Sequence, residues 1–194
     1  MRLAIFGGSF DPPTLGHTMA CLWALESGEV DRVLLIPVAH HAFGKEPGAD
    51  FPHRLAMCRL ATGRLGGGVQ VLDIEARRPG ISYTIDTLDA LAAEFPGARF
   101  RLLTGSDVAA QIGKWRRGDE VLRRAPLLEI PRPLAGESTG DRPGALAAIS
   151  STAARNALAA ADPTASLFLG AAVRQYIRQH GLYTTEATPE RKPT

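Results

Sequence analysis

One loop near the start of the chain combines glycines, hydroxyls and a histidine in a spacing suited to phosphate chemistry. Its sequence is Gly7-Gly8-Ser9-Phe10-Asp11-Pro12-Pro13-Thr14-Leu15-Gly16-His17. The loop follows a short apolar run, and a helix is expected to begin near Thr14. Glycines let backbone amides approach an anion closely, and the free N–H groups and positive dipole end of a helix favour its charge. The loop therefore predicts a phosphate-binding site.

Two common nucleotide-binding fingerprints do not fit this loop. It contains neither the Gly-Lys-Ser/Thr end of a Walker A motif nor the Gly-x-Gly-x-x-Gly spacing of dinucleotide-binding folds. Both a P-loop kinase and a dehydrogenase are therefore disfavoured.

Two later segments could form a second wall around the same anion. Gly105-Ser106-Asp107 follows a predicted strand, and Ile149-Ser150-Ser151-Thr152 opens a predicted helix that carries Arg155 one turn further on. Hydroxyls and amides at a helix start can receive phosphate. The alternative interpretation is structural, with Asp107 and the Ser/Thr residues as ordinary helix caps and Arg155 as a surface cation.

The elements that must position these residues alternate between β-rich runs and helical apolar spacing. Strands are predicted at Leu3–Phe6, Arg32–Val38, Val69–Ile74, Phe100–Leu103 and Leu127–Ile130. The alternation predicts an α/β fold, a Rossmann-like doubly wound parallel sheet of order 3-2-1-4-5 with a small helical C-terminal part. In that order Gly8 and Gly105 lie beside one crevice.

Helical spacing also predicts which residues are buried. Leu15, Met19, Leu22 and Trp23 share one face of the first helix and are expected in the core. The isolated Cys21 and Cys58 fall within such patterns and are expected to be small core residues, neither metal ligands nor disulfide partners.

Composition and charge limit the classes of protein that fit. Hydrophobic residues make up 45% of the chain and charged residues 22%, as in globular proteins. The net charge is +2, and the Lys and Arg residues form no dense basic stripe, so a nucleic-acid partner is not expected. A small anionic substrate fits better. The apolar runs fall short of the roughly 18 to 20 residues that span a bilayer. A cytoplasmic protein is expected, and a homo-oligomer is compatible with the sequence.

The first loop resembles the GxFDPxHxGH signature of the nucleotidyltransferase superfamily, with Thr14 at the position of the first histidine. Further segments resemble bacterial nicotinate mononucleotide adenylyltransferases: Pro52-His53-Arg54-Leu55-Ala56-Met57, Ser82-Tyr83-Thr84-Ile85-Asp86-Thr87-Leu88, Gly105-Ser106-Asp107, Lys114-Trp115-Arg116, Ile149-Ser150-Ser151-Thr152-Ala153-Ala154-Arg155 and His180-Gly181-Leu182-Tyr183. Residues 1–183 are therefore expected to form a single nucleotidyltransferase domain. Residues 184–194 lack an apolar pattern and are expected to be a disordered tail.

The resemblance implies roles for residues around ATP. His17 donates to an ATP phosphate, Thr14 is either a helix cap or a neutral phosphate donor, and Lys45 and Arg155 contact phosphates. Asp107 contacts ribose hydroxyls. The remaining ATP-binding positions implied are Gly7, Gly8, Ser9, Phe10, Gly16, Gly105, Ile149, Ser150, Ser151 and Thr152. Asp11 is expected to cap its own turn.

The same resemblance implies a site for the second substrate. Trp115, followed by Arg116, stacks on a pyridine ring, and Ser82, Tyr83 and Thr84 recognise its carboxylate or amide through backbone groups. Nicotinate and nicotinamide both remain open. The implied reaction is attack by the mononucleotide phosphate on the α-phosphorus of ATP, with Mg²⁺ carried by the phosphates and with no metal ligand from the chain.

Two other functions remain as alternatives. One is adenylyl transfer to another phosphate acceptor such as phosphopantetheine, because phosphopantetheine adenylyltransferases also carry Thr at the position of Thr14. The other is a nucleotide-binding regulator that has lost turnover through changes at Thr14 and in residues His40–Lys45.

Overall fold

A computed structural model of the protein describes residues 1–40, 46–131 and 149–184. The predicted tail therefore lies outside the described residues from residue 185 onward, and only Thr184 is described. No helix within these ranges has both the length and the apolar character needed to cross a bilayer.

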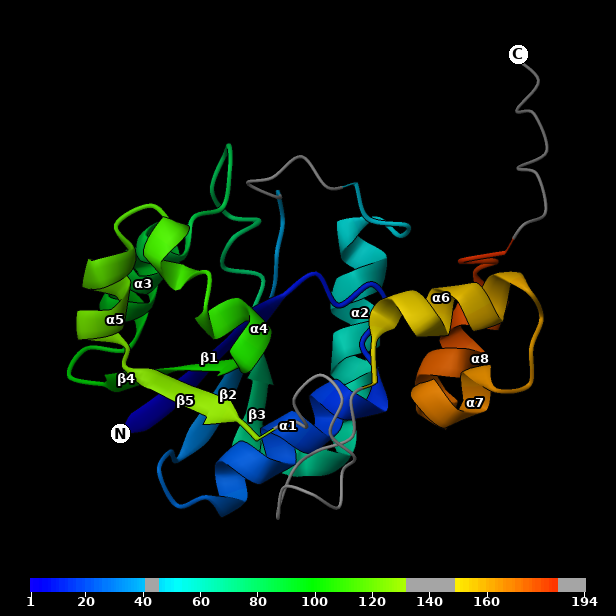
Figure 1. Cartoon of the computed structure of the whole chain (residues 1–194), viewed down its shortest axis with the longest axis horizontal. Helices are drawn as coiled ribbons and strands as arrows, with labels where there is room; N and C mark the ends of the chain where they lie inside the picture. Colours follow the sequence, from blue (N-terminus) through cyan, green and yellow to red (C-terminus); the bar gives the residue numbers. More distant parts are fainter. Residues whose placement is uncertain (41–45, 132–148, 185–194) are drawn as a thin grey trace.

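The centre of the fold is a five-stranded, all-parallel sheet of order β3-β2-β1-β4-β5 (Figure 1). Its strands are Arg2–Gly8 (β1), Arg32–Pro37 (β2), Val69–Val71 (β3), Arg99–Gly105 (β4) and Leu127–Ile130 (β5). The predicted fold class, strand positions and strand order are confirmed. The third strand ends at Val71, earlier than predicted, because the chain enters a turn in which the Ala76 amide donates to the Asp73 carbonyl.

The connecting segments are mainly helical. The α-helices are Leu15–Glu26 (α1), Phe51–Thr62 (α2), Thr84–Glu94 (α3), Ser106–Ala109 (α4), Gly118–Arg124 (α5), Ser151–Ala159 (α6), Ala165–Phe168 (α7) and Ala171–Gln179 (α8). In the described part of the chain, 3₁₀ segments cover Gly63–Gly68 (η1) and Ile112–Lys114 (η2).

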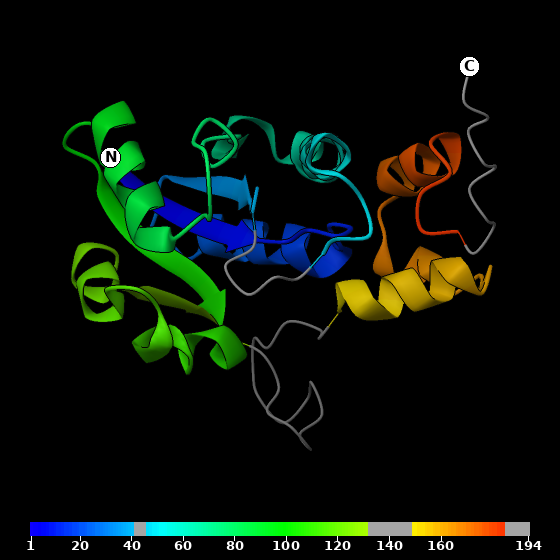
Figure 2. The same cartoon turned by 90° about the horizontal axis from the view of Figure 1, so that it is seen from above.

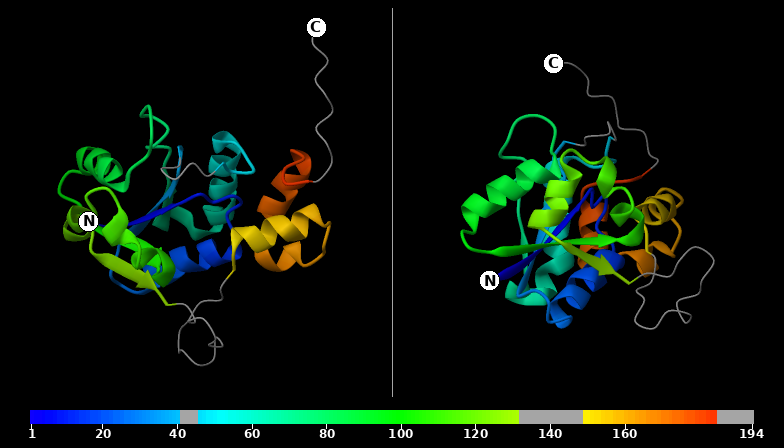
Figure 3. Two further views of the ribbon diagram at one scale, coloured as in Figure 1. Left: turned by 45° about the horizontal axis from the view of Figure 1, so that its top comes forward. Right: turned by 60° about the vertical axis from the view of Figure 1, so that its left-hand side comes forward.

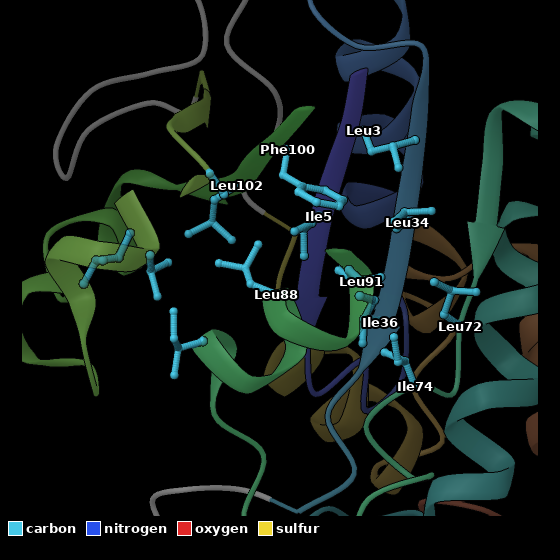
Figure 4. Close-up of a cluster of buried hydrophobic side chains, with 14 residues drawn as sticks. Leu3, Ile5, Leu34, Ile36, Leu72, Ile74, Leu88, Leu91, Phe100 and Leu102 are labelled. Atoms are coloured by element: carbon cyan, nitrogen blue, oxygen red, sulfur yellow. The ribbon is translucent and has the colours of Figure 1, made fainter. Parts of the chain in front are cut away.

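Alternate side chains along each strand point to opposite faces of the sheet. Leu3 and Ile5 join the apolar cluster beneath α3 and α5, part of which is drawn in Figure 4. Ala4 and Phe6, their neighbours on β1, join a second cluster with α1 and Cys58 of α2. Both faces of the sheet are therefore covered, as a parallel sheet requires.

The prediction for the buried face of α1 was only partly right. Gly16, Ala20, Cys21 and Ala24 are the buried residues of this helix, whereas Leu22 is 46% exposed. Small side chains let the helix lie close to the sheet. The face with the small residues is therefore buried, and not the face with the largest apolar side chains.

The last three helices form a separate apolar cluster with α2. Ala154 of α6 and Val173 and Ile177 of α8 pack with Met57 of α2 and with Leu169. Figures 2 and 3 show these helices gathered at one end of the molecule, on the side away from α3 and α5. The start of α6 thereby comes beside the first loop.

Candidate active site

The two predicted glycine loops meet where the strand order changes direction. Strands β1 and β4 are hydrogen-bonded neighbours at the centre of the sheet, and Gly8 and Gly105 are their last residues. In open α/β sheets this switch point is where ligands bind, beyond the carboxyl ends of the strands. The predicted convergence of Gly8 and Gly105 is confirmed.

His17 is held in a defined orientation by the residue that caps its helix. The backbone N–H of Thr14 donates to Nδ1 of His17 over 2.9 Å. Nδ1 is therefore an acceptor, so the neutral imidazole carries its proton on Nε2. Nε2 is therefore the ring nitrogen that carries a hydrogen and acts as a donor.

The hydroxyl of Thr14 is also engaged within the protein. It lies 2.9 Å from Nδ1 of His17 and donates to the Ile149 carbonyl over 3.4 Å. Thr14 is only 1% exposed. Its geometry suits a residue that orients His17 and joins the first loop to the segment before α6.

Two phenylalanines support the His17 ring. The ring of Phe10 meets it edge-on with centroids 5.0 Å apart, and that of Phe6 lies at 5.9 Å. Phe10 is buried, with a left-handed φ of 47°. A Cβ on Gly8 would lie 3.1 Å from the Phe10 ring, so glycine makes room for it. Gly8 and Phe10 thus act on the site by placing His17.

A second helix N-terminus meets the first beside His17. The Ser150 hydroxyl caps α6 by accepting from the Ala153 amide over 3.1 Å, and Ser151 Oγ donates to the Pro12 carbonyl over 2.8 Å. A Cβ on Gly16 would lie 3.3 Å from the Ile149 carbonyl oxygen, so glycine permits this close approach. Neither α1 nor α6 has an acidic residue in its first turn. The two positive dipole ends together favour an anion.

Asp11 lies behind this pair of helix starts and joins segments that are far apart in the sequence. Its carboxylate accepts from the amides of Gly48 over 2.8 Å and Ala49 over 3.1 Å, and from the Tyr183 hydroxyl over 2.7 Å. Burial and this hydrogen bond raise the pKa of Tyr183. Asp11 therefore links the segments around Gly48 and Tyr183 to the first loop, whereas the sequence analysis expected it to cap the turn in which it lies.

Two arginines flank Asp11. Arg155 lies with Nη1 3.5 Å from the Asp11 carboxylate, and it also donates to the Asp11 carbonyl and to Thr152 Oγ1. Arg54 is 1% exposed and donates to the carbonyls of Ala49 and Ser9 over 3.1 and 2.8 Å. Burial lowers the pKa of Arg54, and the nearby Asp11 charge opposes that shift.

Arg54, Gly48 and Tyr183 belong to this site, although the sequence analysis assigned them no role in it. Arg54 and Tyr183 stand in segments that carry the family resemblance, which was the available signal. Their contacts with the first loop could not be read from spacing, since Tyr183 and Asp11 are 172 positions apart.

The predicted acceptor residues form a second group. The guanidinium of Arg116 lies over the ring of Tyr83, 4.8 Å from its centroid, and 3.8 Å from the Asp86 carboxylate. Trp115 is half-buried against the apolar cluster beneath α3. Tyr83 caps α3, which begins at Thr84. The structure therefore joins the two segments expected to hold the mononucleotide.

The other predicted site residues are placed less fully. Gly7 is exposed at the end of β1, and Ser9 accepts from Arg54. Asp107 belongs to α4, and Lys45 lies outside the described residues. Within the described ranges, no cluster of three or more His, Cys, Asp or Glu side chains could hold a metal ion.

Comparison with known proteins identifies the family. Residues 5–157 match the family model described as cytidylyltransferase-like. Over 187 residues, 94% of this chain and 96% of the relative, the chain is 40% identical to a protein of Anaeromyxobacter dehalogenans named "Probable nicotinate-nucleotide adenylyltransferase". The chain belongs to the nicotinate-nucleotide adenylyltransferase family, within the cytidylyltransferase-like proteins.

Two further comparisons agree with this family. A Myxococcus xanthus protein of the same name is 35% identical over 191 residues, covering 97% of this chain and 98% of the relative. The structure of Plasmodium falciparum nicotinic acid mononucleotide adenylyltransferase complexed with NaAD aligns with a TM-score of 0.73 at 21% identity, covering 94% of this chain and 97% of that one. At that identity the structural match bears on the fold, and it confirms the predicted architecture.

Proposed function

We infer that this protein is a nicotinate-nucleotide adenylyltransferase, which transfers the adenylyl group of ATP to nicotinate mononucleotide and releases pyrophosphate in NAD biosynthesis. The observation that carries the inference is the orientation of His17 by the Thr14 N–H, at the point where the N-termini of α1 and α6 meet. This geometry suits a polyphosphate that gains charge as it departs, and the family membership names the acceptor.

The reaction is an in-line substitution at the α-phosphorus of ATP. An oxygen of the mononucleotide phosphate forms the new P–O bond while the bond to the β-phosphate oxygen breaks and pyrophosphate takes the electron pair. No covalent intermediate with the enzyme is needed, so catalysis consists of positioning and charge stabilisation. His17 Nε2–H donates to a phosphate oxygen whose charge grows during the transfer.

The other phosphate contacts follow from the arrangement of α1 and α6. Backbone amides at Gly7, Gly8 and Ser9, the amides of Ile149–Thr152 and the hydroxyls of Ser150 and Thr152 surround the triphosphate, with Gly105 and Asp107 toward the ribose. Arg155 leaves its contacts with Asp11 to meet the phosphates, and Lys45 joins it. Thr14 acts through His17, because its own hydroxyl is already bonded inside the protein.

Magnesium fits this site as an ion carried by ATP. The groups that face the loop are N–H donors, hydroxyls and a guanidinium, all of which bind phosphate oxygen, while the Asp11 carboxylate is occupied by Gly48, Ala49 and Tyr183. When bound, Mg²⁺ neutralises part of the phosphate charge. The protein's own residues orient the triphosphate and donate hydrogen bonds to it.

The acceptor is placed by the second group of residues. Trp115 stacks on the pyridine ring, and backbone N–H groups of Tyr83 and Thr84 donate to its carboxylate, while the Ser82 amide holds the loop through its hydrogen bond to the His40 carbonyl. Arg116, held over Tyr83, supplies a positive charge at the edge of this group. Donor groups suit nicotinate, because its carboxylate accepts only.

The direct test measures pyrophosphate release by the purified protein with Mg-ATP and one acceptor at a time: nicotinate mononucleotide, nicotinamide mononucleotide or phosphopantetheine. Release with nicotinate mononucleotide is the expected result. Turnover with phosphopantetheine alone would assign the other transferase function, and no turnover with any acceptor would reject the enzyme.

A further inference from the structure

A buried carboxylate lies beneath the acceptor loop, and no step of the reaction described above uses it. Glu75, four residues after the end of β3, is 7% exposed. Its Oε2 accepts from the Ala39 amide over 3.3 Å, and its Oε1 accepts from the Thr87 hydroxyl over 3.0 Å. One side chain therefore joins the chain after β2 to the first turn of α3.

Thr87 extends this connection to a cation. It is 2% exposed, and its hydroxyl accepts from Nη2 of Arg78 over 2.8 Å while it donates to Glu75. The order of donors and acceptors is thus guanidinium to hydroxyl to carboxylate. A buried charge is tolerated when it is hydrogen-bonded and has a counter-charge nearby, and Arg78 supplies that counter-charge.

The acceptor loop is fastened to the same carboxylate. The Ser82 side chain lies near enough to Glu75 to lower the pKa of that carboxyl, and the Ser82 backbone amide donates to the His40 carbonyl over 3.1 Å. A cleft of about 180 Å³ opens beside this junction, lined in part by Arg78, Ser82 and Asp86. The loop from Ser82 to Thr84 therefore receives its position from Glu75 and from the chain after β2.

Ionisation of Glu75 is balanced between opposing effects. Burial raises the pKa of its carboxyl, while hydrogen bonds from Thr87, Ser82 and the Ala39 amide and the charge of Arg78 act in the opposite direction. Each of these hydrogen bonds uses the carboxylate as an acceptor. Loss of a single donor would therefore release one attachment of the loop and also weaken the remaining ones.

We propose that Glu75 is a positioning residue that fixes the Ser82–Thr84 loop in the shape that binds the mononucleotide, with Thr87 as the link to Arg78. The proposal rests on the proposed function, because it concerns the acceptor subsite of that reaction. It assigns affinity for the acceptor, and not for ATP, to a carboxylate that acts through the loop above it.

A matched pair of substitutions at Thr87 tests the proposal. Thr87→Val keeps the shape of the side chain and removes the hydroxyl, whereas Thr87→Ser keeps the hydroxyl and removes a methyl group. Loss of a hydrogen bond to a charged group predicts that Thr87→Val raises the KM for nicotinate mononucleotide about tenfold or more. The KM for ATP should change less than about twofold, and Thr87→Ser should stay near the wild-type values. Packing alone predicts the reverse order, with Ser worse than Val.

Glu75→Gln provides a second test that does not depend on Thr87. Its amide group places a donor against donors, so the same selective rise in the KM for the mononucleotide is expected. Equal changes in both KM values, no change in either, or Thr87→Ser worse than Thr87→Val would overturn the proposal. Absence of turnover by the wild-type protein would instead reject the proposed function, so the two failures are distinguishable.

Discussion

The phosphate end and the acceptor end of the crevice are built in different ways. At the phosphate end, the side chains of Thr14, Asp11 and Arg54 are buried and bonded to distant parts of the chain. At the acceptor end, Tyr83 and Trp115 are half-buried and Arg116 is exposed, with a contact to Asp86 at 3.8 Å. The phosphate end is held by buried hydrogen bonds within the protein. The acceptor end places partly exposed side chains on a loop that packs on the residues beneath it.

This difference separates the kinds of damage that substitutions can do. Changes at the phosphate end disturb a preorganised donor or the buried charges that hold it, so they should reduce kcat or the stability of the fold. Changes at the acceptor end remove contact surface from a loop that stays in place, so they should appear mainly in one KM value.

The largest effect is expected at His17. In His17→Ala the proposed donor to the departing phosphates is lost, and kcat should fall about 10²- to 10³-fold, as for removal of one preorganised donor. Steady-state kinetics with nicotinate mononucleotide measure the change, and circular dichroism checks that the fold is retained. Near-normal kcat in a folded variant would remove His17 from the mechanism.

Asp11→Asn should lower the free energy of unfolding, because the phosphate end depends on the charge of this carboxylate. The substitution removes the carboxylate opposite Arg155 and places an NH₂ group among amide and hydroxyl donors. Breaking a buried charge pair in this way costs about 3 to 5 kcal/mol of unfolding free energy. Urea denaturation measures it.

Asp86→Asn is the matched control at the acceptor end, where the pair with Arg116 is exposed. It should cost about 0.5 kcal/mol or less. Similar losses for the two variants would contradict the distinction between the two ends.

Trp115→Ala should affect one substrate only. Stacking of an aromatic side chain on a base is worth about 1 to 3 kcal/mol, so the KM for nicotinate mononucleotide should rise about tenfold or more while the KM for ATP stays within about twofold. Trp115→Phe, which keeps a ring, should recover most of the loss. A rise in the KM for ATP of the same size would place Trp115 outside the acceptor subsite.

The smallest effect is expected at the two cysteines beneath the phosphate end. Burial raises the pKa of Cys21 to about 12 and raises that of Cys58 as well, so both thiols stay protonated and unreactive. Iodoacetamide should leave the native protein unlabelled over a period in which the urea-unfolded protein reacts at both positions. Rapid labelling of the native protein would indicate that α1 and α2 separate readily.

The sequence was sufficient for the fold and for the outline of the crevice. Short β-rich runs located the strands, and the two glycine loops predicted that Gly8 and Gly105 meet, because strand ends are governed by local pattern and by topology. The buried face of α1 was misjudged, since small residues such as Ala20 gain their importance only from the closeness of the sheet.

The internal attachments of the site could not be predicted. Asp11 accepts a hydrogen bond from Tyr183, and Glu75 accepts hydrogen bonds from Ala39 and Thr87. No rule based on sequence spacing predicts these pairs. From the sequence alone, a buried carboxyl cannot be distinguished from an ordinary surface acid, because its hydrogen-bond donors are not known. The roles of individual site residues therefore remain predictions, to be tested by the substitutions above.

The bond between Tyr183 and Asp11 has a consequence for synthesis of the chain on the ribosome. All five strands are complete once Ile130 has been made, so the sheet can form while the later helices are still being synthesised. The first loop is among the earliest residues to emerge. It forms its contacts with Arg155 and Tyr183 only after the last helices have been synthesised. A nascent chain arrested before α6 would therefore hold a folded sheet with an incomplete catalytic loop, and the enzyme would gain activity as one of its final folding events.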